Sequence, residues 1–329
     1  MAVGSGIGSQ FGFSAESVYG TYVAPTKFVR GTSYSIDPKP ERVQGEGIQA
    51  GVLGMLSSHF VETTKGVEAS IEADVQTSGF GLLLQAITGG TSTSEQQAAT
   101  AAYLQTHTLG DDYGKSLTAQ IGRPTRGGTA VPATIKGAKV TQAEFSCAVN
   151  EILKLSLTLD GQSYDNSTAL AVASYATAVP FHGAQMTLKL GAFGSEAAVS
   201  GVRSVSSSWS RPHDTADYTA DATGLKAEPV LNGATEITGT ISADWLAKAT
   251  FEDVALANSS TSLVWLFEGA TIATTYKQTF RLTLPVVHLE PAAQGVGGRN
   301  ELTTDWNYTW KYDGTNLPKI EYQTADTAL

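Results

Sequence analysis

Two stretches of this 329-residue chain share one pattern: NEILKLSLTLDG at 150–161 and NELTTDWNYTWKYDG at 300–314. Each begins with Asn-Glu, continues as alternating residues and reaches Asp-Gly, which is typical of a half-buried strand followed by a turn. A second pair agrees, because IEADV at 71–75 recurs in the same order as ISADW at 241–245. The pattern predicts that the second half of the chain repeats the first. The alternative is a chance likeness of strand-turn patterns.

The repeat predicts two domains, residues 1–164 and 180–329, joined by an Ala/Ser/Thr-rich linker at 165–179. Each would be about 150 residues long, an ordinary domain size. Strict alternation, as in VEASIEADV at 67–75, predicts strands through most of both domains. Helical signals occur at 79–88 and 250–267. The expected fold class is mainly β, with two tandem sandwich or barrel domains that each carry a short flanking α-helix.

The composition indicates a protein that assembles. Charged residues make up only 16% of the chain, against about 25% in ordinary soluble domains. Part of the surface is therefore expected to be covered by neighbouring subunits. The formal net charge is −10 and no cluster of Lys and Arg is present, which argues against specific binding of nucleic acid.

No targeting or membrane segment is expected. The N-terminal residues do not have the pattern of a signal peptide, and no run of apolar residues approaches the length of a membrane span. The single cysteine, Cys147, lies in an alternating segment and is expected to be a small buried residue. We therefore expect a protein made in a cytoplasm.

No motif in the sequence indicates catalysis. The segment 110–116 resembles a phosphate-binding loop, but it has one residue too few between its glycines. Histidines are far apart in the sequence and none has a metal-ligand spacing: His59, His107, His182, His213 and His288. We expect no enzyme activity, no cofactor and no metal.

Two long excursions and one aromatic stripe remain as candidate functional features. The excursions, 37–60 and 211–232, interrupt the strand pattern, and long loops in compact domains usually carry function. The aromatic residues fall on alternate positions of one strand: Trp306, Tyr308, Trp310 and Tyr312. Core packing, a subunit interface and a carbohydrate-stacking platform all remain open for this stripe.

Four stretches together resemble the tail tube proteins (major tail proteins) of long-tailed bacteriophages. They are SGIGSQFGFSAESVYGTYVAPTKF at 5–28, the strand at 67–75 with LLLQAITGG after it, GAKVTQAEFSCAVNEILKLSLTLDG at 137–161, and ITGTISADW at 237–245. The order and spacing of these stretches carry the resemblance over most of the chain. The insertions at 91–108 and 165–179 fit the family pattern less clearly.

The resemblance implies a structural subunit of a tail tube, and it favours a non-contractile tail. Inner strands would close a ring around a channel, and stacked rings would be joined by a long loop from each domain. A chain with two copies can satisfy this geometry with three subunits and pseudo-sixfold symmetry, which is favoured over a ring of six chains. The implied inter-ring loop residues are Pro38, Pro40, Gly45, Gly47, Gly51, Arg211, Pro212, Asp217, Tyr218 and Gly224.

The implied partners are other copies of the chain, the tape measure protein, and the tail terminator and distal tail proteins. Phage DNA would pass through the lumen without specific binding, and no membrane is involved. The implied location is the virion tail, after assembly in the host cytoplasm. Two alternatives remain: a β-sandwich adhesion, carbohydrate-binding or virion decoration module, and a tail-completion or baseplate protein that forms a single ring.

Overall fold

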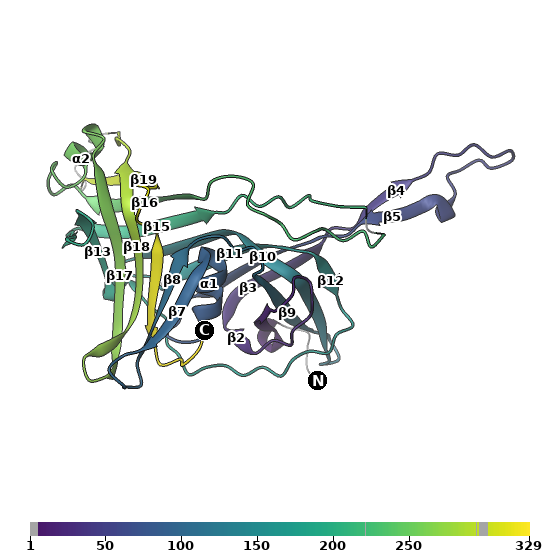
Figure 1. The fold of residues 1–329 in the computed structure, drawn as a ribbon, viewed down its shortest axis with the longest axis horizontal. Coiled ribbons are helices and arrows are strands. Elements are labelled where there is room, and N and C mark those ends of the chain that lie inside the picture. Colours follow the sequence, from purple (N-terminus) through teal and green to yellow (C-terminus); the bar gives the residue numbers. More distant parts are fainter. Residues whose placement is uncertain (1–5, 221, 294, 296–301) are drawn as a thin grey trace.

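Most of the described chain is β-strand. The computed structural model describes residues 6–220, 222–293, 295 and 302–329, and within them the chain forms twenty strands and two α-helices (Figure 1). This confirms the mainly β class expected from the sequence.

The elements of the first half, up to residue 165, are β1 (Gln10–Glu16), β2 (Lys27–Val29), β3 (Gly31–Pro38), β4 (Glu41–Gln44), β5 (Phe60–Thr64), β6 (Val67–Asp74), α1 (Gly81–Thr88), β7 (Gly89–Gln96), β8 (Tyr103–Leu109), β9 (Ser116–Pro124), β10 (Ala130–Ala148), β11 (Lys154–Gly161) and β12 (Ser163–Asp165). The elements of the second half are β13 (Met186–Gly191), β14 (Ala197–Ala198), β15 (Val202–Ser210), β16 (Glu236–Asp244), α2 (Glu252–Leu256), β17 (Ser260–Ala273), β18 (Tyr276–Leu289), β19 (Thr303–Trp310) and β20 (Lys319–Thr324). Short 3-10 turns occur at Gly6–Gly8, Ser57–His59 and Gly183–Gln185.

A central antiparallel sheet runs through both halves in the order β3-β6-β11-β10-β15-β16-β19. Strand β10 joins the halves, because Phe145 faces Leu155 of β11 on one side and Ser207 of β15 on the other. The two halves are therefore connected by backbone hydrogen bonds as well as by the covalent chain.

Each half arranges its strands in the same spatial order. The first half pairs β3-β6-β11-β10-β9-β1, and the second pairs β15-β16-β19-β18-β17-β13. A register irregularity occurs at the same point in both, between Gly31 and Ser33 of β3 and between Val202 and Ser204 of β15. The two series thus have one strand topology.

The second half has an additional sheet in which a hairpin from the first half takes part. Strands β7 and β8 form this hairpin, and β8 pairs with β20, which in turn pairs with β18. In Figure 1, strands β13, β17 and β18 cross the direction of β10, β11, β15 and β16. The core lies between these layers.

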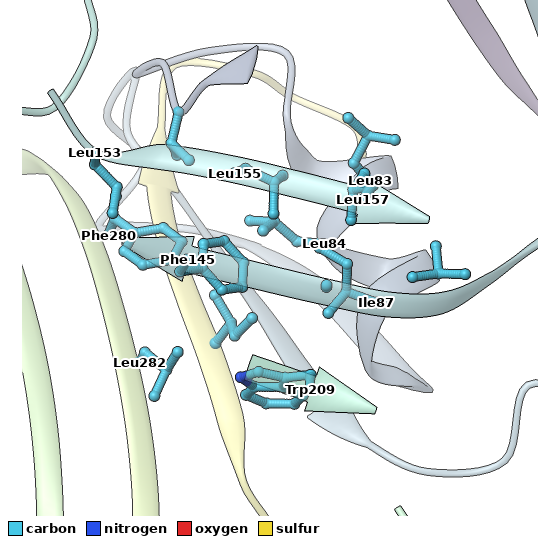
Figure 2. Packing of buried hydrophobic residues seen from close by; sticks show 14 of the residues in the cluster. Leu83, Leu84, Ile87, Phe145, Leu153, Leu155, Leu157, Trp209, Phe280 and Leu282 are labelled. Atoms are coloured by element: carbon cyan, nitrogen blue, oxygen red, sulfur yellow. The ribbon is translucent and has the colours of Figure 1, made fainter. Parts of the chain in front are cut away.

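The core is apolar and rich in aromatic side chains (Figure 2). The rings of Phe145 in β10 and Phe280 in β18 lie 5.4 Å apart, so the two sheets contact each other directly. Trp209 of β15 is fully buried, and Leu83 and Leu84 of α1 pack from the first half. Burial of each such side chain stabilises the fold by about 1.5–3 kcal/mol.

One expectation about local structure needs correction. Only Glu252–Leu256 of the segment 250–267 is helical, and residues from Ser260 onward form β17. Both faces of β17 are buried along residues 262–267, so its apolar run has no alternation that would distinguish a strand from a helix. The polar stretch 91–102 contains most of β7 and leads into β8, and is therefore the end of a hairpin. Cys147 is buried, as expected.

Candidate assembly surfaces

One face of the central sheet packs on the core and the other is polar. On β6 the apolar residues point inward and Glu68, Ser70 and Glu72 point outward. The same alternation continues across β11, β10, β15, β16 and β19, where the outward residues are Lys154, Ser156, Thr158, Gln142, Glu144, Ser146, Ser206, Ser208, Thr238, Thr240, Ser242, Asp305 and Asn307. Most of these side chains are short, so this polar face is a broad surface of hydroxyls and carboxylates.

The polar face carries an excess of negative charge. Register places Glu72 beside Ser156, and Ser156 beside Glu144 on the next strand. Lys154 faces Asp74, and Arg203 forms an ion pair with Asp244 at one end of the sheet. Several carboxylates on this face therefore have no basic neighbour opposite them in the sheet.

Strand β3 is an edge of the central sheet. Within the described chain it pairs with β6 only, and most of its residues are exposed. Its outer backbone groups are available to another strand, and exposed edges of this kind pair readily with a second chain.

The excursion after β3 forms an arm, residues 39–64, that projects far from the sheets (Figure 1). Its base is the two-stranded hairpin β4-β5, in which Val43 faces Val61. Pro38 ends β3, Pro40 precedes β4, and Gly45, Gly47 and Gly51 lie in the outer loop. The arm exposes large apolar side chains: Val43, Ile48, Val52, Leu53, Met55, Phe60 and Val61.

The second excursion, 211–232, is held against the body of the protein. Its first residue, Arg211, is buried and donates to the carbonyl oxygens of Thr88 at 2.6 Å and Gly110 at 2.9 Å. Pro212 follows, and its carbonyl oxygen accepts from the backbone N–H of Asn232 at 2.6 Å. The two ends of the excursion are thus fixed to each other and to the first half.

A buried ionic cluster fixes the excursion further. The His213 Nε2 lies 2.8 Å from Asp112 Oδ2, and the Lys139 Nζ lies 2.7 Å from a Glu228 carboxylate oxygen. Burial alone would raise the pKa of Asp112. The hydrogen bond with His213 and the charge of Arg211 outweigh it, and the pKa of Asp112 is held below its ordinary value.

A second buried pair lies nearby, between Lys226 of the excursion and Asp160 of β11. Here burial is the larger effect, and it raises the pKa of Asp160 although Lys226 opposes it. Both clusters are buried because the excursion covers one end of the polar face.

The two excursions meet at the base of the arm. The N–H of Lys65 donates to the carbonyl oxygen of Gly224 at 2.7 Å, and the Tyr218 hydroxyl donates to the carbonyl oxygen of Lys65 at 3.1 Å. The carbonyl oxygen of Asp217 accepts from Ala227 within the excursion. The structure thus brings together Tyr218, Gly224 and the base of the arm, while Gly45, Gly47 and Gly51 lie further out along it.

The ionic cluster was missed by sequence reasoning. Asp112, Lys139 and Glu228 of this cluster, and Asp160 and Lys226 of the second buried pair, are scattered in the sequence, and only the topology unites them. Lys139 and Asp160 did give a signal, since each is a charged residue inside a strand and opposes the other in register.

The aromatic stripe packs in the core. Trp306 and Tyr308 are fully buried, and the rings of Trp306 and Phe251 stack 5.6 Å apart. Tyr312 is exposed. Core packing, one of the three interpretations left open, therefore accounts for Trp306 and Tyr308, and these rings cannot stack on a sugar.

The described residues contain no group of three or more His, Cys, Asp or Glu side chains placed to hold a metal ion. None of the helices they form has the length and apolar character needed to cross a membrane.

Comparison with known proteins gives one clear match. A family model described as phage tail tube protein matches residues 6–310. A search of the curated proteins finds no match. The matched range includes the polar face, the arm and the second excursion, and it covers nearly the whole chain. The chain therefore belongs to the phage tail tube protein family.

Proposed function

We propose that the chain forms rings that stack into a tail tube, and that the polar face lines a channel for the genome. Membership of the family makes the chain a structural component of a phage tail.

The single observation that carries the proposal is the polar face. The hydroxyls and carboxylates of this face would lose their hydrogen bonds to water if an apolar surface covered them. The face is therefore suited to contact with water. DNA carries one negative charge per about 1.7 Å of helix axis. Unpaired carboxylates such as Glu72 and Glu144 would repel it, so DNA would slide past without binding.

The shared strand topology of the two halves supports a duplicated chain. If residues 1–164 and 180–329 are two copies joined by 165–179, three chains supply six equivalent units to one ring. Within the chain, β10 of the first half pairs with β15 of the second. The same contact between subunits would continue the sheet around the ring.

With this symmetry, β3 and the end of β18 would close the ring. β3 takes the same position in its series as β15, but its outer edge is unpaired in the described chain. β18 takes the position of β10. We therefore expect β3 to pair with the segment that follows β18, residues 290–293, in a second copy.

The arm and the second excursion would act between rings. Both follow strands that point the same way in the sheet, so both emerge at one end of it. An arm with many exposed apolar side chains is suited to packing against a neighbouring ring. The tape measure, tail terminator and distal tail proteins are the proposed partners at the lumen and the two tube ends, after assembly in the host cytoplasm.

Negative-stain electron microscopy of the purified, concentrated protein tests this function. We expect hollow, regularly striated tubes whose end-on averages show sixfold features with threefold modulation. Isolated rings at every concentration would support a tail-completion or baseplate ring protein instead. Single compact particles alone would contradict assembly by this chain, and glycan binding would then be measured.

A further inference from the structure

The geometry points to a specific acceptor for the arm: a groove at the opposite end of the central sheet in a second copy of the chain. This inference rests on the proposed stacking of rings and names the surface on which the arm would act. It concerns residues 39–64 of one subunit and the segment 244–254 with its neighbours in another.

The groove lies where β13, β14 and β16 end. Its volume is about 480 Å³, and its apolar lining includes Leu190, Val199, Leu246, Phe251 and Val254. Leu246 is 65% exposed and Leu256, nearby in sequence, is 66% exposed. Large apolar side chains at the rim of an apolar groove are typical of a surface that binds another protein segment.

The equivalent end of the first half is already covered. The N–H of Thr77 donates to the carbonyl oxygen of Val179, and the N–H of Phe181 donates to that of Val75. The Asp326 carboxylate accepts from the N–H of Gly79 at 2.6 Å. The linker and the C-terminal segment thus occupy, in the first half, the place that remains open in the second.

The two long excursions also differ between the halves, but here it is the first half that is exposed and the second half that is fixed. In the second half the excursion is fixed by Arg211 and by the buried pair of Lys226 with Asp160. In the first half the arm is exposed, and Leu53 near its tip is 106% exposed. Among the described residues, each subunit therefore offers one free arm and one open groove.

The arm and the groove lie at opposite ends of one sheet (Figure 1). β3 runs toward the arm, and successive antiparallel pairings make β16 run the other way, toward the groove. A translation along the strands brings the arm of one copy to the groove of the next. The contact is heterologous and does not close, so it propagates a stack.

The chemistry of the two surfaces is complementary. Ile48, Leu53 and Met55 are exposed in the free subunit and would leave water on entering the groove, which favours the contact. The flexible Met55 side chain can adapt to the shape of the groove.

Cysteine crosslinking in assembled tubes tests the inference. Leu53→Cys protein and Leu246→Cys protein are mixed, assembled and mildly oxidised, with buried Cys147 left in place. The control mixes Leu53→Cys with Val172→Cys, a linker residue that is 91% exposed. We expect a mixed disulfide dimer from the first pair, in at least tenfold excess over the control pair.

Two results separate this inference from the proposed function. Tubes that form without preferential Leu53–Leu246 crosslinking overturn the acceptor groove and leave tube formation standing. Failure of the wild-type protein to form tubes overturns both. As a second measurement, Leu246→Asp should raise the critical concentration for assembly at least tenfold while Val172→Asp does not. Normal assembly of Leu246→Asp would also overturn the inference.

Discussion

The backbone N–H of Lys65, at the base of the arm, donates to the carbonyl oxygen of Gly224 in the second excursion at 2.7 Å. This bond joins the two long excursions, although they come from different halves of the chain. Since the second excursion is fixed by buried charges, the bond anchors the arm at its base and leaves its tip free.

Substitution of Gly224 should loosen this anchor. Gly224 has a φ of +68°, and an added Cβ would lie 2.7 Å from the carbonyl oxygen of Thr63. For Gly224→Ala we expect hydrogen exchange of the Lys65 amide to quicken at least tenfold, about 1.4 kcal/mol in local opening. Gly54→Ala is the control, because nothing lies within 4 Å of its added Cβ. Unchanged protection of Lys65 would show that Gly224 does not hold the base.

The stability of the subunit should depend on His107. Burial lowers the pKa of His107 to about 4, from 6.5. Between these values the unfolded chain binds a proton that the folded chain does not, so stability falls as pH falls from 6.5 to 4. The loss is about 3 kcal/mol at 1.36 kcal/mol per pH unit.

Urea unfolding at pH 7.5 and 4.5 measures this effect. His107→Gln can keep the hydrogen bond with Ser92 and should lose less stability between the two pH values than the wild type. The exposed His59→Gln variant is the control. Equal losses in His107→Gln and the wild type would exclude His107 as the source.

Gly239 of β16 should tolerate no side chain. An added Cβ would clash with the carbonyl oxygen of Ser206 and with the Tyr308 hydroxyl. That hydroxyl donates to Ser206 at 2.8 Å, directly across Gly239. We expect Gly239→Ala to destabilise the fold by roughly 1–3 kcal/mol, as overpacking does. Gly47→Ala, in the open arm, is the control. A melting temperature equal to the wild type would contradict the close approach.

The arm should matter for assembly and not for folding. Ile48 and Leu53 are fully exposed in the subunit, so the double variant Ile48→Ser, Leu53→Ser should keep the wild-type melting temperature. We expect it to form no tubes at concentrations where the wild type does, by sedimentation and electron microscopy. Val172→Ser in the linker provides a control of similar exposure. Tubes of normal yield would exclude the arm from the inter-ring contact.

Reversal of charge on the polar face should create DNA binding. Glu72 and Glu144 flank Ser156 in one row across the sheet. Tubes of the variant Glu72→Lys, Glu144→Lys should retain duplex DNA with an affinity that falls steeply as salt rises. The variant Glu95→Lys, Glu268→Lys changes the net charge equally on exposed strands elsewhere. If the control retains DNA equally well, the effect comes from net charge alone.

Much of the fold could be predicted because alternation is a strong signal. The polar and apolar residues of 67–75 identified β6 and its inward face correctly. However, aligning the two repeats on Asn150-Glu151 and Asn300-Glu301 places the strands that follow one residue out of register. In the structure Lys154 faces Asp74 and Thr303 faces Asp244, so Lys154 and Thr303 occupy equivalent positions. A one-residue shift exchanges the two faces of a strand, which composition alone does not reveal.

The surfaces were harder to predict than the strands. Both excursions contain Pro and Gly and have similar length, so their residue pattern does not distinguish them. Their difference depends on tertiary partners, such as Ile87 and Thr88, whose carbonyl oxygens accept from Arg211. The free arm could have been recognised by its apolar residues outside any alternating pattern, with Ile48 and Leu53 the clearest.

Cryo-electron microscopy of assembled tubes, by helical reconstruction, tests the central claim most directly. We expect three chains per ring, with the polar face toward the axis and Glu72, Ser156 and Thr240 on the wall of an open channel. A tube in which this face lies on the outer surface, or is buried between subunits, would contradict the account.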